Sequence, residues 1–346
     1  MDIGSALKFG KKNEETPEDR ALMLERAREI HAETIVVDGH LGTFSGLVGV
    51  SESGQESVQG RVSLAGLRES GVKCAVLSAF IFERLWPMRG VRTGLQYADE
   101  FSAICKTPGV RSVERSGDIE EARQNGEVGL MLGFEGAEFL DGSIAALRMF
   151  YRLGLRVLQL TWNERNALAD GAAEGNTRGG LTHFGREVLR EAGTLGILVD
   201  LAHISEAGFW DVAEVSEHPF VVSHANCHSL YGHPRNLTND QLRAIRDTGS
   251  VVGISINPSY MASSHQEVTV STVCDHIEHA VDVAGESHVA LGTDMGSFST
   301  PLPEGLSGSG DLHLITLELL RRGMPGKTIS SLLGGNWMRV FRAVVG

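Results

Sequence analysis

The fold is decided by a short stretch, ILVDLAH at residues 197–203, in which a run of apolar residues ends in a histidine. Seven other stretches have the same build: TIVVDGH at 34–40, VKCAVLSAF at 72–80, EVGLMLGFEG at 127–136, LRVLQLTW at 155–162, PFVVSHA at 219–225, SVVGISIN at 250–257 and HVALGTDM at 288–295. Most of the eight are continuously apolar rather than alternating. This pattern is typical of strands that are buried on both faces of a parallel sheet.

The segments between these strands have helical patterns, at residues 97–105, 144–153, 184–195, 206–215, 238–248 and 273–284. Eight strand–helix alternations without a break in composition predict one (β/α)8 barrel of the TIM type, as a single domain over residues 1–346. A doubly wound sheet is the alternative, but it usually has fewer strands.

Additional helices are expected at both ends of the chain, over residues 17–32, 312–321 and 329–344, after a flexible segment at 1–16. Thr16 can cap the first of them, because Pro17 suits the first turn and acidic residues follow. Two long loops rich in glycine and serine, at 41–63 and 296–311, follow strand ends, where barrels place their active sites.

Composition and charge exclude several classes of binding partner. The chain has 346 residues, 42% of them hydrophobic, and a net charge of −13, which argues against nucleic-acid and anionic-membrane partners. The sequence contains no run of about 20 apolar residues, the length that spans a bilayer, and its first residues do not resemble a signal peptide. The four cysteines contain no CxxC pair, so we expect reduced thiols and a cytoplasmic protein.

Five strands end in residues that suit metal chemistry, namely His40, Glu135, His203, His224 and Asp294. In a barrel these side chains converge at one mouth although they are far apart in the sequence. Imidazole nitrogens and carboxylate oxygens are ligands for Zn²⁺ and similar cations, and a carboxylate can bridge two ions. Asp294 could take a proton from water activated by the metal. The pattern predicts metal-assisted hydrolysis.

The sequence resembles the membrane dipeptidase (renal dipeptidase) family of zinc peptidases, over about residues 25–344. The segments that carry the resemblance, in order, are VVDGH at 36–40, GFEGAE at 133–138, LTWNERNALADG at 160–171, LVDLAHIS at 198–205, FVVSHANCHSLYGHPRNLTNDQL at 220–242, HVALGTDM at 288–295, PEGL at 303–306 and GGNWMRVFRAV at 334–344. None would suffice alone, but their combination is specific.

The resemblance implies a barrel with two zinc ions and a dipeptide or similar small substrate. His40 matches a ligand of the first ion, Glu135 the bridging ligand, and His203 and His224 the ligands of the second ion. Asp294 matches the acid that handles the proton of the attacking water. The resemblance also implies a homodimer.

Two further residues would contact the substrate. Arg235 matches the residue that binds the substrate carboxylate, a role that suits a guanidinium fork, although a surface ion pair is the alternative. Trp162 stands where many members have a histidine that stabilises the tetrahedral intermediate. Its indole N–H is still a donor, but packing in the barrel mouth is an equally good interpretation. Tyr260 could also reach a substrate carboxylate.

The sequence departs from the family pattern at two metal-related positions. The family reads His-x-Asp at the first strand, whereas this chain reads His40-Leu41-Gly42 and so lacks one carboxylate ligand. Gly296 likewise replaces a second acid after the last strand. Asp38 has the same strand parity as His40 but lies one layer deeper, so we expect a structural role for it.

These departures leave three functions open. The first is a dipeptidase with two zinc ions. The second is a hydrolase of another amide or a lactone with one ion, because Glu135, His203 and His224 alone form a sufficient catalytic zinc set. The third is an inactive scaffold or binding protein, to which the absence of an acid at Gly42 points. The retention of Asp294 and Arg235 counts against this third function.

Overall fold

The computed structural model describes residues 16–42, 61–81 and 89–346. The segment expected at 1–16, apart from Thr16, and most of the loop expected at 41–63 lie outside the described residues. Thr16 caps the first helix, as predicted: its side chain accepts a hydrogen bond from the Asp19 N–H, and Pro17 occupies the first turn.

Eight parallel strands form the barrel in sequence order: β1 (Val36–Leu41), β2 (Val72–Phe80), β4 (Val128–Glu135), β5 (Leu155–Gln159), β6 (Leu198–Asp200), β7 (Val221–Ala225), β8 (Val251–Ile254) and β9 (Val289–Leu291). An isolated parallel bridge between Leu41 and Met295 joins the last strand to the first. The eight strands match the eight predicted stretches, so the (β/α)8 barrel is confirmed and the doubly wound sheet is wrong.

One short strand was not predicted. Strand β3 (Val110–Ser112) pairs with the start of β4, from Val128 to Leu130, whereas β5 pairs with β4 only from Leu132 onward. It therefore extends the β4 edge before β5 begins. Three residues are too few to give a recognisable hydrophobic run.

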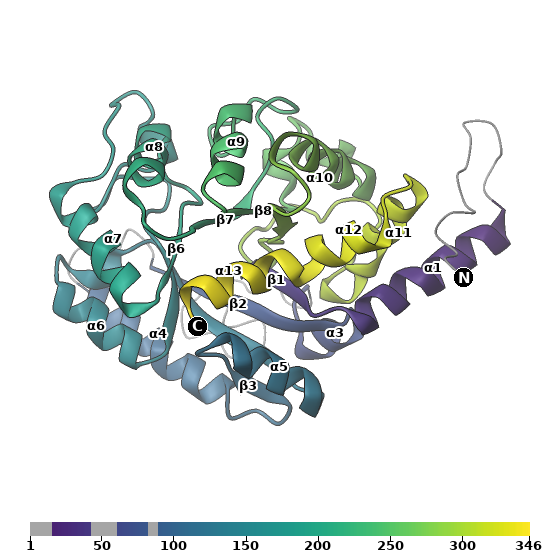
Figure 1. The fold of residues 1–346 in the computed structure, drawn as a ribbon, viewed down its shortest axis with the longest axis horizontal. Coiled ribbons are helices and arrows are strands. Elements are labelled where there is room, and N and C mark those ends of the chain that lie inside the picture. Colours follow the sequence, from purple (N-terminus) through teal and green to yellow (C-terminus); the bar gives the residue numbers. More distant parts are fainter. Residues whose placement is uncertain (1–15, 43–60, 82–88) are drawn as a thin grey trace.

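Helices surround the strands (Figure 1). They are α1 (Pro17–Glu33), α3 (Leu64–Glu69), α4 (Gly90–Ile104), α5 (Ser116–Asn125), α6 (Ile144–Arg152), α7 (His183–Leu195), α8 (Glu206–Val215), α9 (Asn239–Asp247), α10 (Val270–Ala284), α11 (His313–Arg321), α12 (Gly326–Ser330) and α13 (Asn336–Val344). Short 3₁₀ turns occur at Glu138–Leu140, Ala172–Glu174, Pro258–Tyr260, His265–Glu267 and Ser309–Asp311, and a π-helical turn, Ser331–Gly335, joins α12 to α13. Helices α3 and α5 were not predicted.

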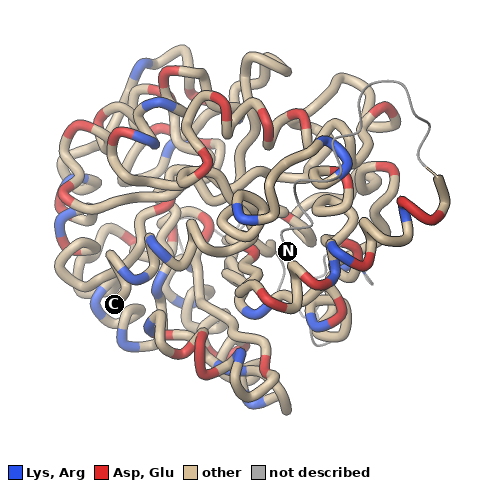
Figure 2. Tube along the Cα trace, turned by 45° about the vertical axis from the view of Figure 1, so that its right-hand side comes forward, with Lys and Arg blue, Asp and Glu red and all other residues tan. Residues whose placement is uncertain are grey.

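Charged residues of both signs are intermixed along the chain trace (Figure 2). Many form surface pairs, such as Arg148 with Glu191 at 2.7 Å. Within the described residues, no helix combines the length and apolar character needed to cross a bilayer.

A buried carboxylate joins the first and last strands of the barrel. The Oδ1 atom of Asp38 accepts hydrogen bonds from the N–H groups of Thr293 (2.8 Å) and His40 (3.2 Å), and Oδ2 accepts one from the Thr293 hydroxyl (2.6 Å). Burial raises the pKa of Asp38, and the bonds from Thr293 oppose this shift. The structural role expected for Asp38 agrees with these contacts.

An indole ring strengthens the same junction. Trp337 of α13 is fully buried, and its Nε1–H donates to the Leu291 carbonyl of β9 at 2.8 Å. The ring also lies directly against Gly39 of β1, where an added Cβ would come within 1.9 Å of it. Glycine at position 39 is therefore a packing requirement in the motif that contains His40.

We expect Asp38→Ala to lower the free energy of unfolding by about 3 kcal/mol or more, because three donors lose their buried acceptor. Thr293→Val removes the hydroxyl, which pairs with Asp38 and the Met295 N–H, but keeps two of the three donors to Asp38, so it should cost less, about 2 kcal/mol. Urea unfolding at pH 7 measures both values. Equal losses in the two variants would show that Asp38 does not act as the shared acceptor.

Candidate metal centre

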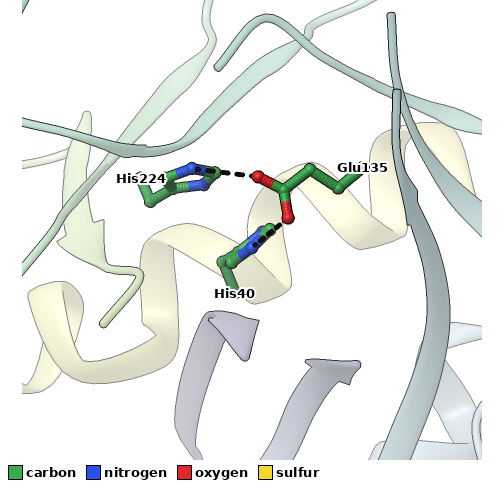
Figure 3. Close-up of side chains that lie close together, drawn as sticks. All are labelled: His40, Glu135 and His224. Carbon is green, nitrogen blue, oxygen red and sulfur yellow. Dashed lines mark ion pairs between the residues drawn. The ribbon is translucent and has the colours of Figure 1, made fainter. Parts of the chain in front are cut away.

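Five side chains predicted from the strand ends converge at the carboxyl end of the barrel. His40 lies in β1, Glu135 is the last residue of β4, and His224 lies in β7. His203 and Asp294 follow β6 and β9 by three residues. All five are at most 5% exposed. Figure 3 shows His40 and His224 pointing to different oxygens of the Glu135 carboxylate.

Glu135 lies at the centre of the cluster. Its Oε2 atom is 3.5 Å from Nε2 of His40, and its Oε1 atom is 3.2 Å from Nε2 of His203 and 4.0 Å from Nε2 of His224. The two ring nitrogens on the Oε1 side are 2.9 Å apart. The carboxylate therefore separates one histidine from a pair of histidines.

Each histidine turns Nε2 toward Glu135 because its Nδ1 has a partner behind it: Ser78 Oγ for His40 at 3.2 Å, Asn163 Oδ1 for His203 at 2.7 Å, and Ser223 Oγ for His224 at 2.9 Å. Asn163 Oδ1 is only an acceptor, so the His203 ring carries its proton on Nδ1 when neutral. This leaves the Nε2 lone pair facing the cluster, which is the arrangement typical of histidines that bind metals.

The electrostatics of the cluster differ on the two sides of Glu135. Burial lowers the pKa of His40, but Glu135 and Asp294 outweigh it and raise that pKa to about 9. Burial, and then Arg235, lower the pKa of His203 to about 3. Burial also lowers the pKa of His224 well below its usual value.

The two carboxylates also differ from each other. Burial raises the pKa of Glu135, but the His40 and His203 rings outweigh it and hold that pKa far below its ordinary value. For Asp294, burial is the largest influence and raises the pKa to about 6. An ionised Glu135 beside the neutral rings of His203 and His224 is the protonation state that metal binding requires.

The donor set fits a divalent cation. One ligand atom from each of His40, Glu135 and His224 lies within 4.8 Å of the others, and all three residues are buried. Nε2 of His40 is buried without a hydrogen-bond partner. Nitrogen and oxygen donors in this number suit zinc and related ions.

Backbone strain marks the same residues. His203 and Asp294 have φ angles of 67° and 62°, in the left-handed region that few residues other than glycine adopt. Oδ1 of Asp294 is 4.0 Å from Nε2 of His40, and Oδ2 accepts a hydrogen bond from the Asn257 amide at 3.0 Å. Strain of this kind is concentrated at functional sites.

Arg235 lies behind His224. The side chain is 6% exposed, its Nη2 donates to the His224 carbonyl at 3.0 Å, and its Nε has no hydrogen-bond partner. The guanidinium carbon lies 5.3 Å from the centre of the Tyr260 ring. Arg235 is therefore a buried cation next to the cluster, and it forms no ion pair with the residues that the structure describes.

Trp162 packs beside the cluster. Its ring stacks on His203 with 5.9 Å between centroids and lies 4.9 Å from the Phe80 ring. The packing role is thus visible.

A cavity of about 500 Å³ also adjoins Arg235. Its lining includes Arg178, Ile204, Trp210 and His228 but none of the four metal-ligand candidates, so it lies beside the cluster rather than over it.

The residues that support the cluster were not predicted from the sequence. Ser223 directly precedes His224, and Asn163 directly follows Trp162, so both were adjacent to residues already singled out. Ser78 and Asn257 carried no signal, because serine and asparagine near strand ends are common. Gly296 has a φ of 90°, so the missing second acid coincides with a backbone conformation that favours glycine.

Comparison with known proteins finds a matching family and similar sequences. The profile of the membrane dipeptidase family, peptidase family M19, matches residues 24–345. An uncharacterized protein from the pqqA 5′ region of Klebsiella pneumoniae is 33% identical over 66% of this chain and 86% of its own length. Dipeptidase 3 of Rattus norvegicus is 31% identical over 83% of this chain, which spans only 59% of the rat protein.

A solved structure shares the fold. It is a metallopeptidase from Rhodobacter sphaeroides bound to a phosphinate mimic of the dipeptide L-Ala-D-Ala. It has 23% identity and a TM-score of 0.79, and the match covers 90% of this chain and 100% of that one.

We expect Asn163→Ala to raise the dissociation constant for Zn²⁺ about 10- to 100-fold, because the His203 ring loses the acceptor that orients it. Asn163→Asp keeps an oxygen acceptor in the same place and should bind Zn²⁺ about as tightly as the unchanged protein. Calorimetric titration of chelator-treated protein measures both constants. Wild-type affinity in the alanine variant would contradict this positioning role.

Proposed function

Because this chain belongs to the membrane dipeptidase family, peptidase family M19, we propose that it is a zinc-dependent dipeptidase that hydrolyses the peptide bond of dipeptides. The observation that carries the proposal is the convergence of three buried histidines, His40, His203 and His224, on the single carboxylate of Glu135. The names of the rat dipeptidase and of the ligand in the bacterial structure support the substrate class.

Glu135, His203 and His224 would hold the ion, and His40 would face it from the other side of Glu135. A bound zinc ion lowers the pKa of water and polarises a carbonyl group, which is the chemistry that amide hydrolysis needs. The Nδ1 partners of the histidines keep all three Nε2 atoms directed toward the centre. The buried position of the cluster excludes bulk water and strengthens its electrostatic interactions.

Asp294 would move the proton. Its Oδ2 atom is held by Asn257, and Oδ1 faces the cluster beside His40. In the proposed reaction the carboxylate takes the proton of the attacking water and delivers it to the leaving amine. A fixed, buried carboxylate suits both transfers, because it can act first as a base and then as an acid.

Arg235 would bind the carboxylate of the substrate's second residue. The guanidinium is anchored to the carbonyl of His224, so the cation lies at a fixed place relative to the metal ligands. A dipeptide places its carboxylate one residue beyond the scissile bond, and a longer peptide does not. The indole N–H of Trp162 would contact the carbonyl oxygen. The proposal also includes a cytoplasmic location and a homodimer. Sedimentation analysis would measure the oligomeric state.

Gly42 favours a second candidate, a hydrolase with one ion that acts on another amide or on a lactone. The position two residues beyond His40 carries no ligand atom, whereas Glu135, His203 and His224 remain. Both candidates use these three ligands and differ in substrate, which hydrolysis assays measure directly.

We expect purified protein with excess Zn²⁺ to hydrolyse members of a panel of L,L and L,D dipeptides, and a chelator to abolish the activity. Asp294→Asn should lower kcat by about 10²- to 10⁴-fold while zinc content is unchanged, because it removes proton transfer but no metal ligand. Hydrolysis that survives the chelator would contradict the proposal. If no dipeptide is hydrolysed by zinc-loaded protein, the substrate assignment is wrong.

We expect Arg235→Met to raise KM for dipeptides by about 10- to 100-fold, the effect of losing a charged hydrogen bond. Dipeptide amides, which lack the carboxylate, should be affected little. The control is Arg243→Met, since Arg243 lies on the surface and pairs with Asp240. Steady-state kinetics on both substrate types measure the difference, and an equal loss on acids and amides would show that Arg235 does not recognise the carboxylate.

A further inference from the structure

The space beside Gly42 is already filled. Gly42 follows His40 by two residues, and its N–H donates to the Met295 carbonyl at 3.1 Å. A Cβ atom added to Gly42 would lie 1.4 Å from Oγ, 2.5 Å from Cβ and 2.9 Å from Cα of Ser297. The two closest atoms, Oγ and Cβ, belong to the serine side chain, so this side chain causes most of the overlap with a side chain at position 42.

Ser297 is also tied to the proposed proton-transfer residue. Its N–H donates to the Asp294 carbonyl at 3.2 Å, and its side chain lowers the pKa of the Asp294 carboxylate against the larger effect of burial. The segment after β9 thus folds back over Asp294 and places the hydroxyl where a side chain from the end of β1 would project. Positions 42 and 297 compete for one volume next to His40.

The two sides of Glu135 therefore offer different numbers of ligands. Oε1 of Glu135 lies with Nε2 of His203 and Nε2 of His224, all within 4.0 Å of one another. Among the described residues, the ion-pair contact of Oε2 is with His40 alone, at 3.5 Å. Asp294 is 4.0 Å from His40, and its carboxylate already accepts a hydrogen bond from Asn257.

We propose that Gly42 and Ser297 are a mutually exclusive pair that limits this chain to one tightly bound divalent cation, held by Glu135, His203 and His224. The Ser297 side chain occupies the volume that a ligand from β1 would need. His40 then contacts substrate or water instead of completing a second ion site. The proposal rests on the proposed function only in that it takes the cluster to be a metal centre.

The pair predicts how substitutions combine. Gly42→Asp alone should not create a second site, because the new carboxylate collides with Ser297. Ser297→Gly alone opens the volume but adds no ligand. Only Gly42→Asp together with Ser297→Gly supplies the ligand and the space.

The test compares the wild type with the two single variants and the double variant. Each protein is stripped with a chelator, titrated with Zn²⁺ by calorimetry and analysed for zinc after dialysis. We expect one ion per chain in the wild type and both single variants, and two ions in the double variant. Two tight ions in the wild type, a second ion in Gly42→Asp alone, or one ion in the double variant would overturn the proposal.

If variants with an acid at position 42 do not fold, the steric part of the proposal is tested by urea unfolding of variants with a smaller side chain there. Gly42→Ala should lower the urea midpoint, and addition of Ser297→Gly should restore most of the loss. An unchanged midpoint for Gly42→Ala would contradict the steric exclusion.

Zinc counting also separates this proposal from the proposed function. One ion without dipeptide hydrolysis refutes only the dipeptidase, whereas a wild type that binds no zinc refutes both.

Discussion

The structure depends on the hydrogen bonds that a buried carboxylate, Asp38, accepts from the last strand of the barrel. Thr293 donates both its N–H and its hydroxyl to Asp38, and the Asp294 N–H donates to the carbonyl of His40 at 3.0 Å. A barrel of parallel strands is closed only when its first and last strands pair, and here the bridge consists of single residues rather than a long ladder. The same contacts bring His40 and Asp294 together, so the hydrogen bonds that close the barrel also position two residues of the candidate site.

A second buried carboxylate repeats this arrangement across the barrel. Oδ1 of Asp200 accepts hydrogen bonds from the N–H groups of Ala202 (2.9 Å) and Ser223 (2.8 Å), and so joins β6 to β7. His203 and His224 directly follow these two donors. Burial raises the pKa of both Asp38 and Asp200, so each carboxylate is costly to bury and must be offset by the hydrogen bonds it accepts. The layer beneath the cluster is polar because it fixes the strands that carry the ligands.

The barrel strands and the ligand candidates could be predicted from the sequence, because both are recognisable within short stretches of it. Each barrel strand is a short apolar run, and each ligand candidate ends such a run, so both are visible without knowledge of their neighbours. The unpredicted strand β3 and helices α3 and α5 are short or weakly apolar. Ser78, Asn163 and Ser223 could not be identified because their roles depend on which strands lie side by side. Gly42 showed that a ligand was absent, but only the structure shows that Ser297 fills its place.

The proposed preference for dipeptides would follow from the path of one segment. Strand β7 carries His224, and the chain then turns so that Arg235 donates back to the His224 carbonyl. The groups proposed to bind the ion and the substrate carboxylate are therefore joined by one hydrogen bond to the backbone of His224. Because Arg235 is buried and its Nε lacks a partner, an incoming carboxylate would satisfy a group that the fold leaves unpaired.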